Sequence, residues 1–193
     1  MRIVLVPALC TVLAAAAFAL DIGKPSPVFT IQRLDGTKTP LTQFRGKVLA
    51  LALIDTECPH CQHLTGLLNT ISKEYASKGV QVVECAFNEG APQLLPGFIQ
   101  KFQPAFPIGY SNHDAVVSYI AWSAVKPLYV PHLVFLDRRG VVQADIAGED
   151  DFMKDPDNNI RKLLDKMVKP ATTTGAPHAH PKTTASAAAP SHP

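Results

Sequence analysis

Short runs of apolar residues alternate along the chain with stretches in which apolar residues recur at helical spacing. Seven apolar residues, Val48–Ile54, follow one another without a polar neighbour, which is typical of a strand buried on both faces of a sheet. Beyond them, apolar residues recur every three or four positions up to Tyr75, and Lys78-Gly79 indicates the end of a helix. A second strand is predicted over Val80–Phe87. The pattern therefore predicts a strand–helix–strand unit in the first half of the chain.

Further elements are predicted on both sides of this unit. In chain order they are a strand at 28–31, a turn at 34–37, a weak helix at 94–102 that contains Pro96-Gly97, an extended segment at 106–110, a helix capped by Asn112 that buries Val116, Val117 and Ile120, a hairpin with strands at 130–137 and 141–147, and a last helix that starts at Asp155-Pro156. A crossover unit followed by a hairpin and a helix indicates an α/β fold, in which helices sandwich a central sheet.

Both ends of the chain differ from this pattern. Residues 1–19 resemble an export signal, with Arg2 at the start, a largely apolar stretch, and Ala17-Phe18-Ala19 as a cleavage site. An uncleaved membrane anchor is the alternative, although the apolar run is shorter than the roughly 18 residues of a spanning helix. From 170 to 193 the chain is rich in Pro, Thr, Ala and His, which predicts a disordered tail. His178 and His180 in this tail could bind a metal only weakly.

Composition indicates one ordinary globular domain over residues 20–169. Hydrophobic residues make up 47% of the chain and charged residues 18%, which are values of a protein with a real core. The net charge of +2 comes without a basic stripe, so nucleic acid is not an expected partner. We expect a monomer that contacts a membrane only if the signal stays uncleaved. Cleavage after residue 19 would remove Cys10 and leave three cysteines, which is one pair and one further thiol, predicted to be Cys85 buried in a strand.

The candidate chemistry lies at Cys58-Pro59-His60-Cys61, where the first buried strand meets the helix. A strand that runs straight into the first helical turn places Cys58 beside free N–H groups and the positive end of the helix dipole, which stabilise a thiolate. Cys61 can reach the same sulfur from further round the turn, so we predict that Cys58 attacks and Cys61 resolves. Half of a metal site and a structural disulfide remain alternatives. A zinc site usually needs four ligands, and the chain has no second Cys-x-x-Cys.

The chain resembles the thioredoxin superfamily, and within it the exported TlpA/ResA-type thiol–disulfide oxidoreductases. The segments that carry the resemblance are Gly23–Phe29, Leu41–Val48, Cys58–Cys61 and Val130–Gly140. The resemblance implies a thioredoxin-like fold with a central mixed sheet and an N-terminal β-hairpin extension. It also implies that Pro131 is a cis-proline facing the dithiol, and that Val130 offers backbone hydrogen bonds to a bound cysteine-containing strand. Proline is the one residue for which a cis bond is cheap.

Two positions depart from the pattern of these relatives. Glu57 stands where Trp commonly precedes the first cysteine, and an acidic neighbour disfavours a thiolate unless it points to solvent. Ala52 stands where many thioredoxin-like proteins have a buried acid that takes the proton of the second cysteine, so Asp55 or Glu84 would have to substitute.

The two residues between the cysteines point in another direction. Pro59-His60 is similar to the pair in DsbA-type oxidants, as is Val130 before Pro131. A positive His60 at the helix start would stabilise the Cys58 thiolate, hence the reduced state, which makes the pair a stronger oxidant. The scaffold is thus similar to reductants and the motif to oxidants, and the direction of electron flow stays open.

The leading hypothesis is an exported, periplasmic thiol–disulfide oxidoreductase that acts on cysteine-containing polypeptides and is recycled by a redox partner protein, without a cofactor or metal. Two alternatives share the fold. A thiol peroxidase of the peroxiredoxin type would need Pro and Thr where the chain has Leu51 and Asp55. A copper chaperone of the related type would space its cysteines by three residues rather than two.

Overall fold

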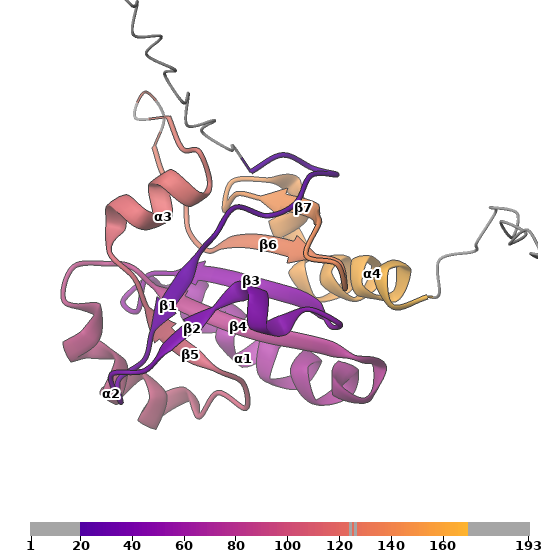
Figure 1. Cartoon of the computed structure of the whole chain (residues 1–193). Coiled ribbons are helices and arrows are strands. Elements are labelled where there is room, and N and C mark those ends of the chain that lie inside the picture. Colours follow the sequence, from indigo (N-terminus) through magenta and orange to yellow (C-terminus); the bar gives the residue numbers. More distant parts are fainter. Residues whose placement is uncertain (1–19, 124, 126, 170–193) are drawn as a thin grey trace, which may run out of the picture.

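The computed structural model describes residues 20–123, 125 and 127–169 (Figure 1). In chain order its elements are β1 (Thr30–Gln32), β2 (Lys38–Pro40), η1 (Leu41–Phe44), β3 (Val48–Ile54), α1 (Pro59–Tyr75), η2 (Ala76–Lys78), β4 (Val80–Ala86), α2 (Ala91–Phe102), β5 (Ile108–Tyr110), α3 (His113–Tyr119), β6 (His132–Leu136), β7 (Val142–Ile146), η3 (Asp151–Lys154) and α4 (Pro156–Val168), where η marks a 3₁₀ helix. The predicted export signal and tail lie outside the described residues.

Within these residues, seven strands form one mixed sheet in the order β2-β1-β5-β4-β3-β6-β7. β3, β4 and β5 run parallel to one another, and the remaining neighbours pair antiparallel. β1 and β2 form a hairpin that joins the sheet where Gln32 faces Tyr110 of β5. The predicted α/β fold with an N-terminal β-hairpin extension is thereby confirmed.

Helices cover both faces of the sheet, which explains why β3 has no exposed position. Its residues Val48, Ala50, Ala52 and Ile54 pack in one apolar cluster with residues of α1, α2 and α4. The intervening leucines pack on the other face with α3, η1 and the segment before β1. Figure 1 shows α3 on the opposite side of the sheet from α1. Burial on both faces confirms the reading of this run as a central strand.

Some predicted boundaries are wrong for identifiable reasons. The first strand was expected at 28–31, but β1 starts at Thr30, because its pairing with β2 runs only from Thr30 to Gln32, and Val28 is 86% exposed. α2 begins at Ala91, before the predicted start, because Pro92 occupies a first-turn position that needs no N–H donor. Asn112 caps α3 as expected through its Oδ1, which accepts from the Ala115 N–H at 2.7 Å. Beyond that cap, Tyr119 rather than Val117 is buried.

No helix among the described residues combines the length and the apolar character needed to cross a bilayer. α1, the longest of them, has 17 residues and carries polar side chains along its exposed face.

Gly109 in β5 provides a test of this packing. A Cβ at this position would lie 2.6 Å from Ile31 Cγ2 and closer still to the Gln32 carbonyl oxygen of β1. Gly109→Ala must therefore separate β1 from β5, and we expect it to lower the free energy of unfolding in urea by about 1–3 kcal/mol.

Gly66→Ala is the matched control. This glycine lies within α1, and nothing stands within 4 Å of the Cβ that alanine would add. Alanine should raise the free energy of unfolding by about 0.5–1 kcal/mol because it favours the helix. Equal stabilities of Gly109→Ala and the wild type would contradict the close contact between β1 and β5.

Candidate active site

The turn between β3 and α1 places the first cysteine of the motif at a helix start. β3 ends at Ile54, after which the Cys58 N–H donates to the Asp55 carbonyl oxygen at 3.3 Å. Cys58 is the N-cap of α1, and its own carbonyl oxygen accepts from the Gln62 N–H at 3.0 Å. Pro59 suits the next position, because the first helical N–H groups have no partner in the helix. The Cys58 thiol therefore lies at the positive end of the α1 dipole.

The two cysteines of the motif are both free thiols, but they differ in burial. Cys58 is partly exposed and Cys61 is fully buried. The Cys61 sulfur accepts from the Asp55 N–H at 3.5 Å. Burial raises the pKa of Cys61 far above its usual range, and the hydrogen bond from the Asp55 N–H opposes this only in part. Cys61 is therefore a protonated thiol at neutral pH, while Cys58 is the sulfur that solvent can reach.

The Val130-Pro131 segment lies opposite the first cysteine. The peptide bond between these residues is cis, as the resemblance implied. The Cys58 thiol donates to the Val130 carbonyl oxygen over 4.0 Å, so this loop and the α1 start face each other. Within the described residues, no hydrogen bond satisfies the Val130 N–H. One backbone donor beside the dithiol is therefore free for a ligand.

The other residues of the motif are on the surface. Glu57, Pro59 and His60 are exposed, and within the described residues the Glu57 carboxylate and the His60 ring have no hydrogen-bond partner. The Glu57 N–H donates to Asp55 Oδ1 at 2.7 Å, which holds the turn. Glu57 thus points its charge to solvent, the condition under which an acid before Cys58 has little effect on a thiolate.

A buried carboxyl lies beneath the dithiol. Glu84 of β4 is fully buried and is the register partner of Ala52, the position that lacks an acid. Thr65 Oγ1 on α1 lies 3.0 Å from Glu84 Oε1 and 3.0 Å from the Cys61 carbonyl oxygen. Burial raises the pKa of Glu84 to about 8, opposed by the Thr65 hydrogen bond, and Glu84 Oε2 has no partner within the described residues. This carboxyl can therefore gain or lose a proton near neutral pH.

The single hydroxyl proton of Thr65 links Glu84 to Cys61. A protonated Glu84 can donate to Thr65, leaving the hydroxyl to donate to the Cys61 carbonyl oxygen. An ionised Glu84 instead accepts the Thr65 proton, and the Cys61 carbonyl oxygen loses that donor. The charge on Glu84 is thus coupled to the helix turn that holds the buried sulfur.

Asn88 is a site residue that reading the sequence missed. Its Oδ1 accepts from the Thr56 N–H at 3.1 Å, and its Nδ2 donates to Thr56 Oγ1 at 3.0 Å. Asn88 therefore ties the loop after β4 to the loop before Cys58. An asparagine shortly after a predicted strand was a weak signal for this role, since such residues bond nearby backbone.

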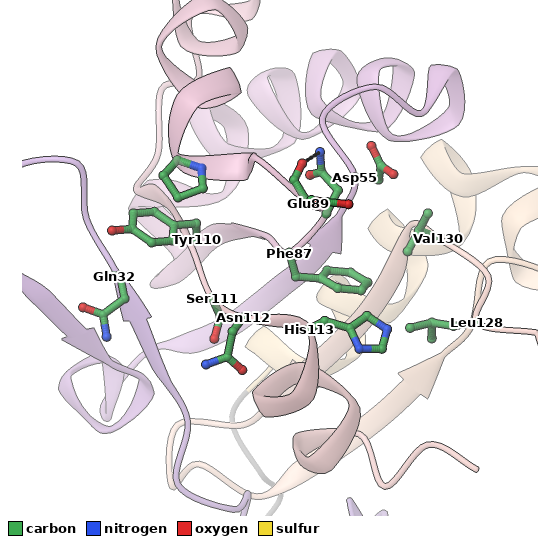
Figure 2. Close-up of a pocket in the computed structure, with 12 residues that line it drawn as sticks. Gln32, Asp55, Phe87, Glu89, Tyr110, Ser111, Asn112, His113, Leu128 and Val130 are labelled. Atoms are coloured by element: carbon green, nitrogen blue, oxygen red, sulfur yellow. Dashed lines mark hydrogen bonds between the residues drawn. The ribbon is translucent and has the colours of Figure 1, made fainter. Parts of the chain in front are cut away.

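Two hollows flank the cis-proline loop. The side groove, as we call it, has a volume of about 790 Å³ and is lined by residues that include Asp55, Phe87, Glu89, Tyr110, Leu128 and Val130. Figure 2 shows Phe87 in the middle of this groove, between Tyr110 and Val130, with Asp55 and Glu89 along one rim. A second hollow of about 390 Å³ lies on the α4 side of the loop and is lined by His60, His63 and Pro131, among others. A ligand held at the cis-proline loop therefore has room on either side.

His132 and Cys85 do not line the dithiol. His132 is buried, and its Nε2 lies 2.5 Å from Asp145 Oδ1 of β7, so it ties two strands together rather than facing the cleft. Cys85 is fully buried within β4, and burial raises the pKa of its thiol. The prediction that Cys85 is a buried apolar residue is confirmed.

Among the described residues, no three His, Cys, Asp or Glu side chains come together in a way that could hold a metal ion. His178 and His180 of the predicted tail lie outside these residues.

Known proteins share both the sequence and the fold. The model of the Redoxin family matches residues 21–175. The thiol-disulfide oxidoreductase ResA of Geobacillus thermodenitrificans is 30% identical over 131 residues, covering 67% of this chain and 71% of that protein. A thiol:disulfide interchange protein from Bacteroides sp. has a TM-score of 0.63 at 18% identity, covering 84% of this chain and 100% of that one. A thioredoxin-family thiol:disulfide interchange protein from Chlorobium tepidum TLS has a TM-score of 0.60 at 20% identity, covering 75% and 98%.

The structural likenesses, at such low identity, concern the fold alone, and the assignment rests on the sequence matches. The chain belongs to the Redoxin family and is a TlpA/ResA-like thiol–disulfide oxidoreductase of the thioredoxin superfamily.

Proposed function

We propose that this oxidoreductase exchanges disulfides with cysteine-containing polypeptides through Cys58 and Cys61, and that it works outside the cytoplasm. The observation that carries the proposal is the contrast between the two sulfurs. Cys58 is partly exposed at the start of α1, whereas Cys61 is fully buried one turn on. A nucleophile has to reach its substrate, while a resolving thiol has only to reach the nucleophile.

In the reducing direction, the Cys58 thiolate attacks one sulfur of a substrate disulfide. The substrate S–S bond breaks, a Cys58–substrate disulfide forms, and the other substrate sulfur leaves as a thiolate that takes a proton from solvent. Cys61 then loses its proton and attacks the Cys58 sulfur, which releases the second substrate thiolate and leaves a Cys58–Cys61 disulfide. Two electrons have passed to the substrate. The same steps in reverse oxidise a dithiol.

Val130 and Pro131 are proposed to hold the substrate backbone. The free Val130 N–H supports this, because an extended peptide can pair with it and place its own sulfur opposite Cys58. A small thiol would have no use for such a contact.

Glu84 is proposed to accept the proton of Cys61. Burial keeps that thiol protonated, so its attack needs a base, and a group that titrates near neutral pH is suited to the task. Thr65 connects the carboxyl to the Cys61 turn.

Export is supported by the predicted signal at residues 1–19. Each exchange changes the Cys58–Cys61 pair by two electrons, so a redox partner protein has to restore it after every turnover. Pro59, His60 and Glu57 are proposed to adjust the reduction potential, and the monomeric state expected from the sequence remains part of the proposal.

Trapping the covalent intermediate tests the proposed function. Cys61→Ala removes the resolving thiol, so the protein, expressed in its native host, should accumulate disulfide-linked adducts with specific proteins. Non-reducing gels followed by peptide identification would measure them. The adducts should disappear on reduction and in Cys58→Ser/Cys61→Ala. Recovery of glutathione adducts only, or of none, would contradict a polypeptide substrate.

Glu84→Gln tests the proton acceptor. We expect release of a peptide from the Cys58 mixed disulfide to slow by roughly 10- to 100-fold at pH 7, because the base is lost, while formation of the mixed disulfide keeps its rate. Stopped-flow measurement of both steps would separate them. Thr65→Val should reproduce the slower release, and equal release rates in Glu84→Gln and the wild type would rule out this role.

The same substitution should change the pH dependence of stability. The pKa of Glu84 is raised to about 8 in the folded protein from an unfolded value of about 4.3. The contribution of Glu84 to the free energy of unfolding is therefore fully present below about pH 4 and is lost as the pH rises to 8. Glu84→Gln should therefore be more stable than the wild type by up to roughly 3 kcal/mol at pH 7. The difference should shrink towards pH 4.5, as measured by urea unfolding of the reduced proteins.

His60→Ala tests whether His60 raises the reduction potential of the Cys58–Cys61 pair. Loss of a positive side chain at the start of α1 removes a partner of the Cys58 thiolate, so the reduction potential should fall by roughly 5–20 mV, the equivalent of one exposed charge near a helix end. Equilibration with glutathione would measure it. The exposed His63→Ala serves as control, and equal potentials in the His60 variant and the wild type would remove this residue from the proposal.

A further inference from the structure

We propose that the side groove is a subsite for a lysine or arginine side chain that lies within two or three residues of the reacting cysteine of the polypeptide substrate. The inference rests on the proposed function, because the groove opens beside the dithiol. It adds a sequence preference that neither the motif nor the fold contains.

The groove is continuous with the place where the substrate cysteine has to lie. Val130 lines it, and the carbonyl oxygen of this residue faces the Cys58 thiol. Asp55 also lines it, and the Asp55 N–H donates to the Cys61 sulfur. A peptide that is extended beside Val130 therefore directs the residues on one side of its cysteine into the groove. Its volume of about 790 Å³ is enough for more than one side chain.

The floor of the groove is apolar. Phe87 at the end of β4, Tyr110 at the end of β5 and Leu128 present rings and methyl groups to it (Figure 2). Phe87 is only 7% exposed, so its ring is fixed by packing. Such a floor can take the aliphatic stem of a lysine or arginine, and an aromatic face attracts the cationic head group.

The rim of the groove is negative. Asp55 and Glu89 are its two acidic lining residues, neither Lys nor Arg lines it, and the Nδ1 of its one histidine, His113, lies 3.5 Å from Asp114 Oδ1. Within the described residues the Glu89 carboxylate has no hydrogen-bond or ion-pair partner, and Asp55 Oδ1 accepts only from the Glu57 N–H. An apolar floor below an unpaired acidic rim matches an amphipathic cation better than it matches a neutral or acidic side chain.

The hollow on the other side of Pro131 has no such bias. Glu149 and Asp150 line it together with Lys154, His60 and His63, so its charges are mixed. The preference for a cation should therefore be confined to one side of the substrate cysteine.

Short peptides that carry one cysteine, as a mixed disulfide with the chromogenic thiol 5-thio-2-nitrobenzoate, test the inference. The Cys58 thiolate attacks the peptide sulfur, the peptide–nitrobenzoate S–S bond breaks, and the coloured thiolate leaves. One series places Lys or Gln two residues before the cysteine, and the other series places them two residues after it. In one of the two series, the full-length reduced protein should react roughly two- to fivefold faster with Lys, as an exposed ion pair allows, and high salt should reduce this ratio.

Glu89→Lys should bring that ratio to one or below. Asp21→Lys is the control, because it makes the same charge change at an exposed position. Asp21 lies near the start of β7, which is the end of that strand farthest from Pro131, so this substitution should leave the ratio unchanged. A ratio of one in both series for the wild type, or an unaltered preference in Glu89→Lys, would overturn the inference. Failure of the proposed function gives a different result, since then no peptide would react faster with the wild type than with Cys58→Ser.

Discussion

Burial of β3 on both faces is the constraint on which the site depends. None of its seven residues is exposed, so the first exposed residues after β3 lie beyond Ile54, in the turn that carries the dithiol. β4 and β5 run parallel to β3 and therefore end at the same edge of the sheet. Asp55, Phe87 and Tyr110 come from the ends of these three strands and meet in the side groove. Parallel sheets commonly bind ligands at the carboxyl ends of their strands, and here one edge holds both the reacting sulfur and the groove beside it.

The same burial accounts for the position of the acid beneath the dithiol. Ala52 and Glu84 are register partners on neighbouring parallel strands, and both face α1. A carboxyl at either position lies under the first turns of that helix. Because the carboxyl belongs to Glu84 on β4, β3 is entirely apolar. Thr65 then connects this carboxyl to the Cys61 backbone by hydrogen bonds. A fully buried acid is destabilising when ionised, which is why we expect the fold to become more stable when Glu84 is replaced by an isosteric amide.

Much of this architecture could be predicted from the sequence, because long apolar runs and helical periodicity reflect burial directly. β3 and α1 are of this kind, and Gly79 with its φ of 81° ends the helical segment as expected. The three-residue strands β1 and β5 are different, since their limits depend on pairing partners distant in sequence. The cysteine spacing located the dithiol, and the resemblance implied the cis bond before Pro131. The link from Glu84 to Thr65 and the side groove had no local signal, because strand register alone brings their residues together.

Electrostatic interactions of opposite sign contribute to the reduction potential of the Cys58–Cys61 pair, and all of them act on its reduced state. The α1 dipole and a charged His60 stabilise a Cys58 thiolate and so raise the reduction potential. Asp55 and Glu57 bring negative charge to the same turn and act in the opposite sense, although the exposed Glu57 is screened by solvent. Burial keeps Cys61 neutral, so this second sulfur adds no further charge to the reduced site. Since about 30 mV corresponds to 1.4 kcal/mol, one exposed charge near a helix end changes the reduction potential by roughly 5–20 mV, which is small beside the roughly 150 mV between thioredoxin and DsbA. The dipeptide between the cysteines therefore adjusts a potential that the scaffold sets, and a scaffold similar to one group is compatible with a dipeptide similar to another.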